Sequence, residues 1–137
     1  MLIQIEGASM GKIVKTLGDA EFEIMQIIWT FDSPISSTRI HAKLLERRNW
    51  HLSTLMTVLA RLVKKGFLCC DRSTGSNLYS ALIQESDYKL EATKAFIDKM
   101  YGGSLQELIL TISTVSQSYD NFPADPKKLS DILTDQS

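Results

Sequence analysis

One face of the segment WHLSTLMTVLARLVKKG, residues 50–66, carries hydroxyl groups and then cations. At 100° per residue this face is formed by Ser53, Thr54, Thr57, Arg61, Lys64 and Lys65. Short hydroxyl side chains let a helix lie deep in the major groove of DNA, where they bond donors or acceptors on base edges. Cations toward the other end favour phosphates, which supply affinity and register without sequence information. The pattern therefore predicts a helix that recognises double-stranded DNA.

The opposite face of the same helix is apolar, and we expect it to be buried; it comprises Leu52, Leu55, Val58, Leu59, Leu62 and Val63. Met56 lies at the boundary of the two faces, where packing and a groove contact are equally good interpretations. A cationic helix face can also be merely solvated, which is the alternative for a lone helix.

The charges of the chain are unevenly distributed around a formal net charge of -1. Residues 34–70 carry seven cations against the single acid Glu46, whereas the residues after 82 carry nine acids against five lysines. A local positive potential attracts a polyanion even when the whole chain is slightly negative. Glu21 and Glu23 precede the basic stretch, and we expect both to be exposed acids at a helix start.

Two helices are expected before the segment 50–66. The first begins at a capping Asp19, and its apolar positions are Phe22, Met25, Ile28 and Trp29. The second is capped by Ser36 or Ser37, and its apolar positions are Ile40, Leu44 and Leu45. Gly66 fits the left-handed residue that ends the third helix.

A β-hairpin is expected next, formed by the runs FLCCDR and SNLYSAL around a polar turn that contains Gly75. Three helices followed by a hairpin is the order of a winged helix-turn-helix, in which the hairpin tip lies beside the duplex backbone. Arg72 at this tip is a candidate phosphate contact. Alternatively, the hairpin only covers the core, with Leu68, Leu78 and Leu82 buried and Tyr79 at its margin.

The residues after 83 predict linked helices. One follows a capping Ser86, Gly102 and Gly103 interrupt it, and the capping box Ser104–Glu107 opens another. The apolar stripe of this region comprises Leu105, Leu108, Ile109 and Ile112, followed by Leu129 and Ile132 in a last short helix. About fifty residues rarely bury enough surface alone, so the stripe needs a partner. A second copy of the chain is the simplest partner, although the basic module or another protein are alternatives.

Several classes of protein are disfavoured. Cys69 and Cys70 are adjacent on a strand, so they point to opposite faces; we expect one buried and one partly exposed cysteine, and no metal site. We find no phosphate loop and no cysteine-histidine couple, and therefore expect no enzyme and no cofactor. The apolar runs are too short to span a bilayer, and Glu6 interrupts the apolar start, which favours a cytoplasmic protein without membrane insertion.

The expected fold class is mainly α with a small β-hairpin. Residues 1–15 form an N-terminal extension for which disorder is one expectation, residues 16–83 form the winged helix-turn-helix domain, and residues 84–137 form a helical dimerisation region. The function that this organisation predicts is binding of a homodimer to a two-fold, palindromic DNA site. The alternative is a winged-helix module that binds proteins and not DNA.

Four stretches of the chain together resemble the penicillinase-repressor family over about residues 16–118. They are LGDAEFEIMQIIW near the start, the spacing of Trp50, Thr57, Arg61 and Gly66, the run QESDY at 84–88, and MYGGSL at 100–105. The resemblance implies a homodimeric winged-helix repressor of resistance or stress genes. It also implies release by proteolysis in the C-terminal region after a membrane metalloprotease sensor detects a β-lactam.

The chain departs from the family pattern at functional positions. The base-contact positions of the family fall on Ser53, Thr54, Met56 and Thr57, and the lysine and arginine common in resistance repressors are replaced by Ser53 and Met56. The family's scissile Asn-Phe bond falls on Thr111–Ile112. We therefore expect a different operator sequence, and Thr111–Ile112 is the candidate cleavage site.

Overall fold

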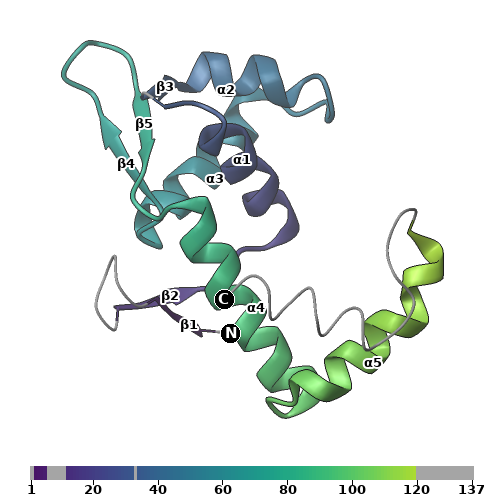
Figure 1. The fold of residues 1–137 in the computed structure, drawn as a ribbon. Helices are drawn as coiled ribbons and strands as arrows, with labels where there is room; N and C mark the ends of the chain where they lie inside the picture. Colours follow the sequence, from purple (N-terminus) through teal and green to yellow (C-terminus); the bar gives the residue numbers. More distant parts are fainter. Residues whose placement is uncertain (1, 6–11, 33, 120–137) are drawn as a thin grey trace. The chain divides into compact units, whose positions relative to one another are not determined.

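The computed structural model describes residues 2–5, 12–32 and 34–119, and it describes side chains within 16–32 and 34–119 (Figure 1). The chain divides into two compact units, residues 1–92 and residues 93–137. We call them the winged-helix unit and the C-terminal unit. Their division lies inside helix α4 (Glu85–Tyr101), whereas the sequence places the start of the dimerisation region just before this helix.

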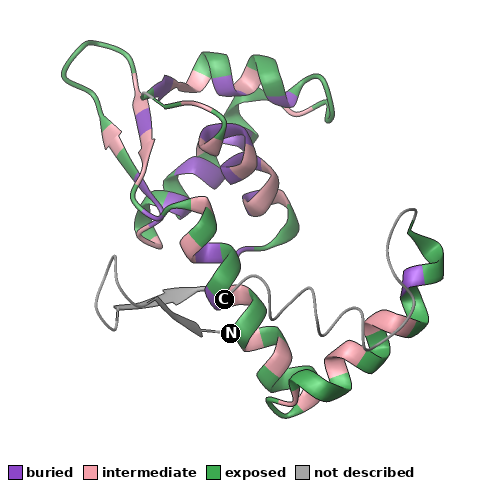
Figure 2. Cartoon of the chain, viewed as in Figure 1, coloured by how far each residue is buried: buried purple, intermediate pink, exposed green. Residues whose placement is uncertain are grey.

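Three helices build the core of the winged-helix unit: α1 (Asp19–Trp29), α2 (Ser37–Leu44) and α3 (Leu52–Lys64). Ser36 caps α2 by accepting a hydrogen bond from the Arg39 N–H at 3.2 Å. The cap of α1 is Gly18, so the predicted Asp19 is instead the first helical residue. Figure 2 shows buried positions on all three helices; the fully buried side chains include Ile24, Met25, Ile40, Leu44, Leu55, Leu59, Leu62 and Phe67.

Three apolar residues that the sequence places in the core are partly exposed instead. Leu45 is 47%, Leu52 is 40% and Val63 is 36% exposed. Leu45 is the C-cap of α2, and Leu52 and Val63 lie in the first and last turns of α3. The core therefore covers the middle turns of both helices but not these terminal residues.

The sheet of the winged-helix unit has three antiparallel strands in the order β3-β5-β4. Strands β4 (Leu68–Asp71) and β5 (Leu78–Ala81) form the predicted hairpin, and β3 (Ile35–Ser36) pairs with β5. Strand β3 was not predicted from the sequence, because a strand of two residues has no period of its own. Gly66, with a φ of 87°, ends α3 in the left-handed conformation that the sequence predicts.

The buried face of the hairpin differs from the predicted one. Tyr79 is only 3% exposed, whereas Leu82 is 54% exposed and Leu78 is half-buried. The strand ends at Ala81, so Leu82 no longer follows its alternation, and Ile83 enters the core. Neither cysteine is fully buried, since Cys69 is exposed and Cys70 is half-buried. An additional hairpin of β1 (Leu2–Ile5) and β2 (Lys12–Lys15) lies within the N-terminal extension, for which the sequence predicts no strand.

The C-terminal unit begins within α4 and continues into α5 (Leu105–Val115) and the short helix η1 (Ser116–Ser118). Gly102 and Gly103 have positive φ values of 56° and 83°, and they separate the two long helices as expected. Ser104 caps α5 by accepting a hydrogen bond from the Glu107 N–H at 3.1 Å. Helix α4 begins at Glu85, so Ser86 lies inside it and is not its cap.

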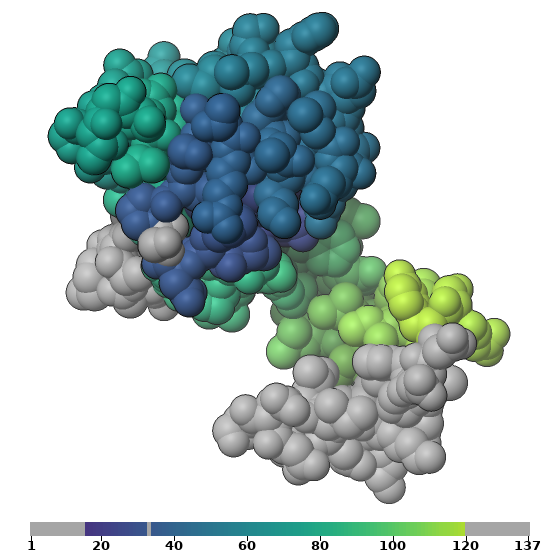
Figure 3. All heavy atoms as spheres, turned by 90° about the horizontal axis from the view of Figure 1, so that it is seen from above, coloured from purple at the N-terminus to yellow at the C-terminus, as the bar shows by residue number. Residues whose placement is uncertain are grey.

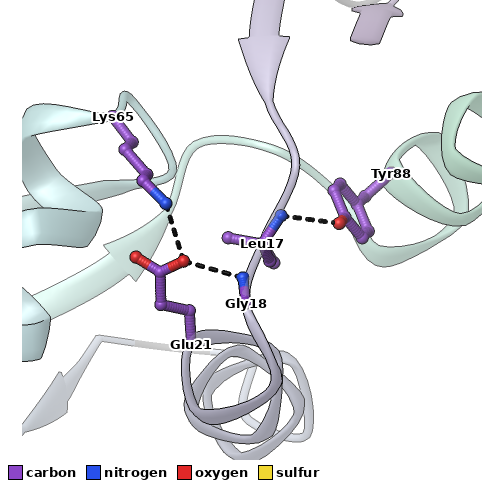
Figure 4. Close-up of polar contacts among 5 residues, drawn as sticks. All are labelled: Leu17, Gly18, Glu21, Lys65 and Tyr88. Carbon is purple, nitrogen blue, oxygen red and sulfur yellow. Dashed lines mark hydrogen bonds and ion pairs between the residues drawn. The ribbon is translucent and has the colours of Figure 1, made fainter. Parts of the chain in front are cut away.

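A buried carboxylate joins α1 to the end of α3. Glu21 is 5% exposed, and its Oε1 accepts hydrogen bonds from Lys65 Nζ at 2.6 Å and from the Gly18 N–H at 2.8 Å (Figure 4). Burial acts most strongly on Glu21 and opposes its ionisation. The hydrogen bonds from Lys65 and Gly18, with the charges of Lys65 and Arg61, together outweigh burial, so the pKa of Glu21 lies below its usual 4.5. The expectation of an exposed acid at Glu21 is therefore wrong.

Replacing Glu21 with Gln should lower the free energy of unfolding by about 2 kcal/mol at pH 7, because Lys65 loses the negative charge of its buried partner. Since the pKa of Glu21 is lowered by folding, its charge stabilises the fold above the usual pKa of 4.5 that applies in the unfolded chain. This stabilisation is lost as the pH falls through the folded-state pKa. Urea unfolding of both proteins between pH 7 and pH 3 should show the difference shrinking below about pH 4.

Glu23→Gln is the matched control, because the partner of Glu23 is the exposed Arg48, with a side chain that is 45% exposed. We expect its effect to stay below about 1 kcal/mol. An equal effect of Glu21→Gln at pH 3 and pH 7 would show that the carboxylate charge does not stabilise the fold.

Candidate nucleic-acid interface

The outward face of α3 is accessible along its whole length. Ser53, Thr54, Thr57, Arg61 and Lys64 are all exposed, and Met56 is half-buried at the boundary of the face. The inward positions of its middle turns are closed: Leu55, Leu59 and Leu62 are fully buried, and Val58 is 7% exposed. The structure thus separates a core side from a polar side as the helical period predicts.

The loop before α3 is held by contacts to the two preceding helices. His41 Nε2 on α2 lies 2.7 Å from the Trp50 carbonyl oxygen. Arg48 forms an ion pair with Glu23 on α1, and its guanidinium carbon lies 6.0 Å from the centroid of the Trp50 ring. These contacts place the first turn of α3, whose N-cap His51 contributes no side-chain hydrogen bond. The start of α3 is therefore positioned by its loop and not by a side-chain cap.

Thr57 has a defined hydrogen-bonding role on the outward face. Its hydroxyl donates to the Ser53 carbonyl oxygen at 3.1 Å, one helical turn earlier. Since the hydroxyl hydrogen is used within the helix, the oxygen can only accept from an external donor, and the methyl group can contact an apolar group. On a base edge, these properties suit an amino group of adenine or cytosine, or the methyl group of thymine.

Lys65 does not share the surroundings of the neighbouring Lys64. The Lys65 side chain is only 17% exposed, and its ammonium group is paired with Glu21 (Figure 4). The ammonium group is engaged inside the winged-helix unit and is not free to meet a phosphate. The predicted phosphate contact of Lys65 is therefore not retained.

The hairpin tip carries Arg72 in an exposed position immediately after β4. The Asp71 carboxylate accepts a hydrogen bond from the Ser73 N–H at 2.9 Å, and this bond holds the pKa of Asp71 below its usual value. Gly75, at a φ of 86°, donates its N–H to the Arg72 carbonyl oxygen at 3.2 Å and closes the turn. The wing therefore has an ordered tip that presents one guanidinium group.

Helix α2 adds exposed cations to the residues that the sequence predicts as DNA contacts. Arg39, Lys43 and Arg47 are exposed on or just after α2, and the Arg39 guanidinium carbon lies 4.8 Å from the Phe31 ring centroid. Helix α2 and the tip of the hairpin both lie at the top of the winged-helix unit in the view of Figure 1, and both are visible from above in Figure 3. The excess of positive charge between residues 34 and 70 is the sequence feature that could have identified these cations as DNA contacts.

The C-terminal unit presents apolar side chains along α5, none of whose residues is fully buried. Leu108, Ile109 and Ile112 are half-buried, while Leu105 is 58% exposed. Thr111, in the candidate cleavage bond, is exposed and donates its hydroxyl to the Glu107 carbonyl oxygen at 3.1 Å. The predicted apolar positions Leu129 and Ile132 lie outside the described residues.

The described parts of the chain contain neither a group of three His, Cys, Asp or Glu side chains placed to hold a metal ion, nor a helix long and apolar enough to cross a membrane.

Comparison with known proteins places these features in one family. The family model for the penicillinase repressor matches residues 17–135. The chain is 36% identical to the methicillin resistance regulatory protein MecI of Mammaliicoccus sciuri over 96 residues, which cover 69% of this chain and 76% of that protein. It is 32% identical to the penicillinase repressor of Bacillus licheniformis over 99 residues, which cover 72% of this chain and 77% of that protein.

A solved structure is also similar: the monomeric form of Bacillus licheniformis BlaI in complex with the blaP half-operator, in solution. It matches with a TM-score of 0.48 and 35% identity, and the match covers 55% of this chain and 90% of that one. The match to the family model over most of the chain decides the assignment. The chain therefore belongs to the penicillinase repressor family of DNA-binding transcriptional repressors.

Proposed function

We propose that this repressor acts as a homodimer that places one α3 helix in each half of a two-fold operator. The observation that carries the proposal is the outward face of α3, where exposed hydroxyl groups precede exposed cations. A two-fold dimer matches a palindromic site, because each subunit meets the same base sequence in the same orientation. The family assignment disfavours the alternative of a winged helix that binds only proteins.

The side chains of this surface divide into two groups by chemistry. Ser53, Thr54 and Thr57, with Met56 at their edge, are short or uncharged and suit contacts with base edges. The exposed cations Arg61, Lys64 and Arg72 suit phosphates, which fix the register of the protein on the duplex. Operator choice would then depend on the first turns of α3, and affinity on its last turn and the wing.

Replacing Thr57 with Ala should change the ranking of operator sequences, because it removes an acceptor and a methyl group. We expect a loss of about five- to tenfold on the preferred site and little loss on unrelated DNA. Lys64→Ala should weaken binding to all sequences alike and reduce the salt slope by about one unit. Binding titrations on a sequence panel at several salt concentrations measure both effects.

Lys65→Ala is the matched control for Lys64, because the two lysines are adjacent but only Lys65 is paired with Glu21. We expect Lys65→Ala to lower stability and leave the salt slope unchanged. If Thr57→Ala weakens binding to every sequence equally, the assignment of base contacts to the first turns is wrong.

We propose that the apolar stripe of α5 forms the dimer interface. Its side chains Leu105, Leu108, Ile109 and Ile112 are exposed or half-buried in the single chain. Burying such side chains against a second copy removes their apolar surface from water. This burial stabilises the dimer by about 25 cal/mol per Å² of apolar surface. Leu129 and Ile132, which lie outside the described residues, belong to the same proposed interface.

Ile109→Asp should dissociate the dimer, because it would place an unpaired charge in this interface. Sedimentation equilibrium should then show a monomer, and operator affinity should fall because each half-site is bound singly. Thr114→Asp is the control, since Thr114 is exposed on the other side of α5. A dimer that survives Ile109→Asp would exclude the stripe as the interface.

We further propose that cleavage in the C-terminal unit releases the operator, with Thr111–Ile112 as the candidate bond and a membrane metalloprotease sensor, or a protease downstream of it, as the upstream partner. The bond lies inside α5, so the helix must unwind before a protease can hold it in an extended form. Binding to chromosomal DNA would place the protein in the cytoplasm.

Mass spectrometry of the protein from cells treated with a β-lactam should detect fragments 1–111 and 112–137. Intact protein in fully induced cells would exclude release by cleavage.

A further inference from the structure

Two consecutive backbone amides connect α4 to the end of the recognition helix. The Leu17 N–H donates to the Tyr88 hydroxyl oxygen at 2.9 Å, and the Gly18 N–H donates to Glu21 Oε1 at 2.8 Å (Figure 4). The same Glu21 oxygen accepts from Lys65, the C-cap residue of α3. A chain of three hydrogen bonds thus runs from α3 through the entry to α1 to the first turn of α4.

All of these groups lie within the winged-helix unit, and the two residues of the first bond are shielded from water. Leu17 is 9% and Tyr88 is 5% exposed. The Tyr88 ring packs against Phe22, Trp29 and Phe67, with centroid distances of 6.1, 6.1 and 5.6 Å. Ring packing holds Tyr88 in the core but tolerates small rotations, whereas the hydroxyl bond fixes the direction of its side chain.

The direction of α4 matters because this helix leaves the winged-helix unit after Ala92 and continues to Tyr101. From Tyr88 to its end the helix extends about 20 Å at 1.5 Å per residue. A tilt of about 10° at Tyr88 would move that end by about 3.4 Å. This displacement equals about one base-pair step along a DNA strand. A small change at Tyr88 is therefore large on the scale of operator spacing.

We propose that Tyr88 and Glu21 are positioning residues that set which spacing between half-sites the dimer accepts. The inference rests on the proposed binding of a homodimer to a two-fold operator. Neither side chain touches DNA in this proposal; they hold the first turn of α4 against α1 and the end of α3 within the winged-helix unit, and α4 continues from there into the C-terminal unit. The affinity for a full operator depends on the half-site affinity and on the effective concentration of the second recognition helix at its half-site. Loosening α4 lowers only the second factor.

The test uses duplexes selected by the wild-type protein from a random DNA pool. Three probes are compared: the full selected duplex, the same duplex with one half scrambled, and full duplexes with one or two base pairs added or removed at the centre. Tyr88→Phe keeps the ring and removes only the hydroxyl. We expect half-site affinity to stay within about twofold, full-site affinity to fall about three- to tenfold, and the penalty for altered spacing to shrink.

Tyr79→Phe is the control, because it also removes the hydroxyl of a buried tyrosine in the same unit but leaves α4 unchanged. It should affect full and half sites equally. Glu21→Gln weakens the other arm of the connection, because it removes the carboxylate charge that holds Lys65, and should produce the same split between full and half sites as Tyr88→Phe. Thermal unfolding monitored by circular dichroism establishes that each variant is folded during the titrations.

Equal losses on full and half sites for folded Tyr88→Phe and Glu21→Gln, or no change in the spacing profile, would overturn the positioning role. A wild-type protein that binds full and half sites with the same affinity would instead overturn the proposed dimeric binding, and with it this inference.

Discussion

The burial of one side of α3 is the constraint on which the other elements depend. Leu55, Leu59 and Leu62 are fully enclosed, and each such side chain contributes about 2 kcal/mol relative to exposure. A helix held by its apolar side cannot rotate without exposing these residues. The hydroxyl groups and cations on the other side therefore keep a fixed direction, as an interface with a rigid duplex requires. Helices α1 and α2 and the short sheet supply the surface against which α3 is held.

The helical periods and the turn residues of the sequence were sufficient to predict α1, α2, α3 and the wing. Those features are local, because an apolar repeat or a capping serine acts within a few residues. The burial of Glu21 was not predictable in the same way, since its partner Lys65 lies 44 positions later. The bond between Leu17 and Tyr88 spans 71 positions, and the pairing of β3 with β5 likewise joins distant segments. Such contacts are decided by the tertiary fold.

The two units use apolar residues differently. In the winged-helix unit the apolar positions of the three helices and the sheet close over one another, and side chains as large as Phe67 and Met25 are fully buried. In the C-terminal unit, Phe96, Met100 and Leu105 are about half exposed (Figure 2). The sequence predicts this contrast, because a segment of this size has too little interior to enclose its own stripe. Among the described residues, none in α5 is fully buried, and for this reason a second copy of the chain enters the proposed function.

The adjacent residues Lys64 and Lys65 illustrate how one helix end serves both folding and binding. Successive residues on a helix point about 100° apart, so two neighbouring lysines cannot face the same surroundings. Lys64 is exposed, so its ammonium group is accessible to a polyanion. Lys65 instead pairs with Glu21 and connects α3 to α1. From the sequence alone, both lysines are predicted to belong to one basic patch. Only the position of a buried carboxylate separates them, and the same carboxylate, through Gly18 and Leu17, connects the recognition helix to the start of α4.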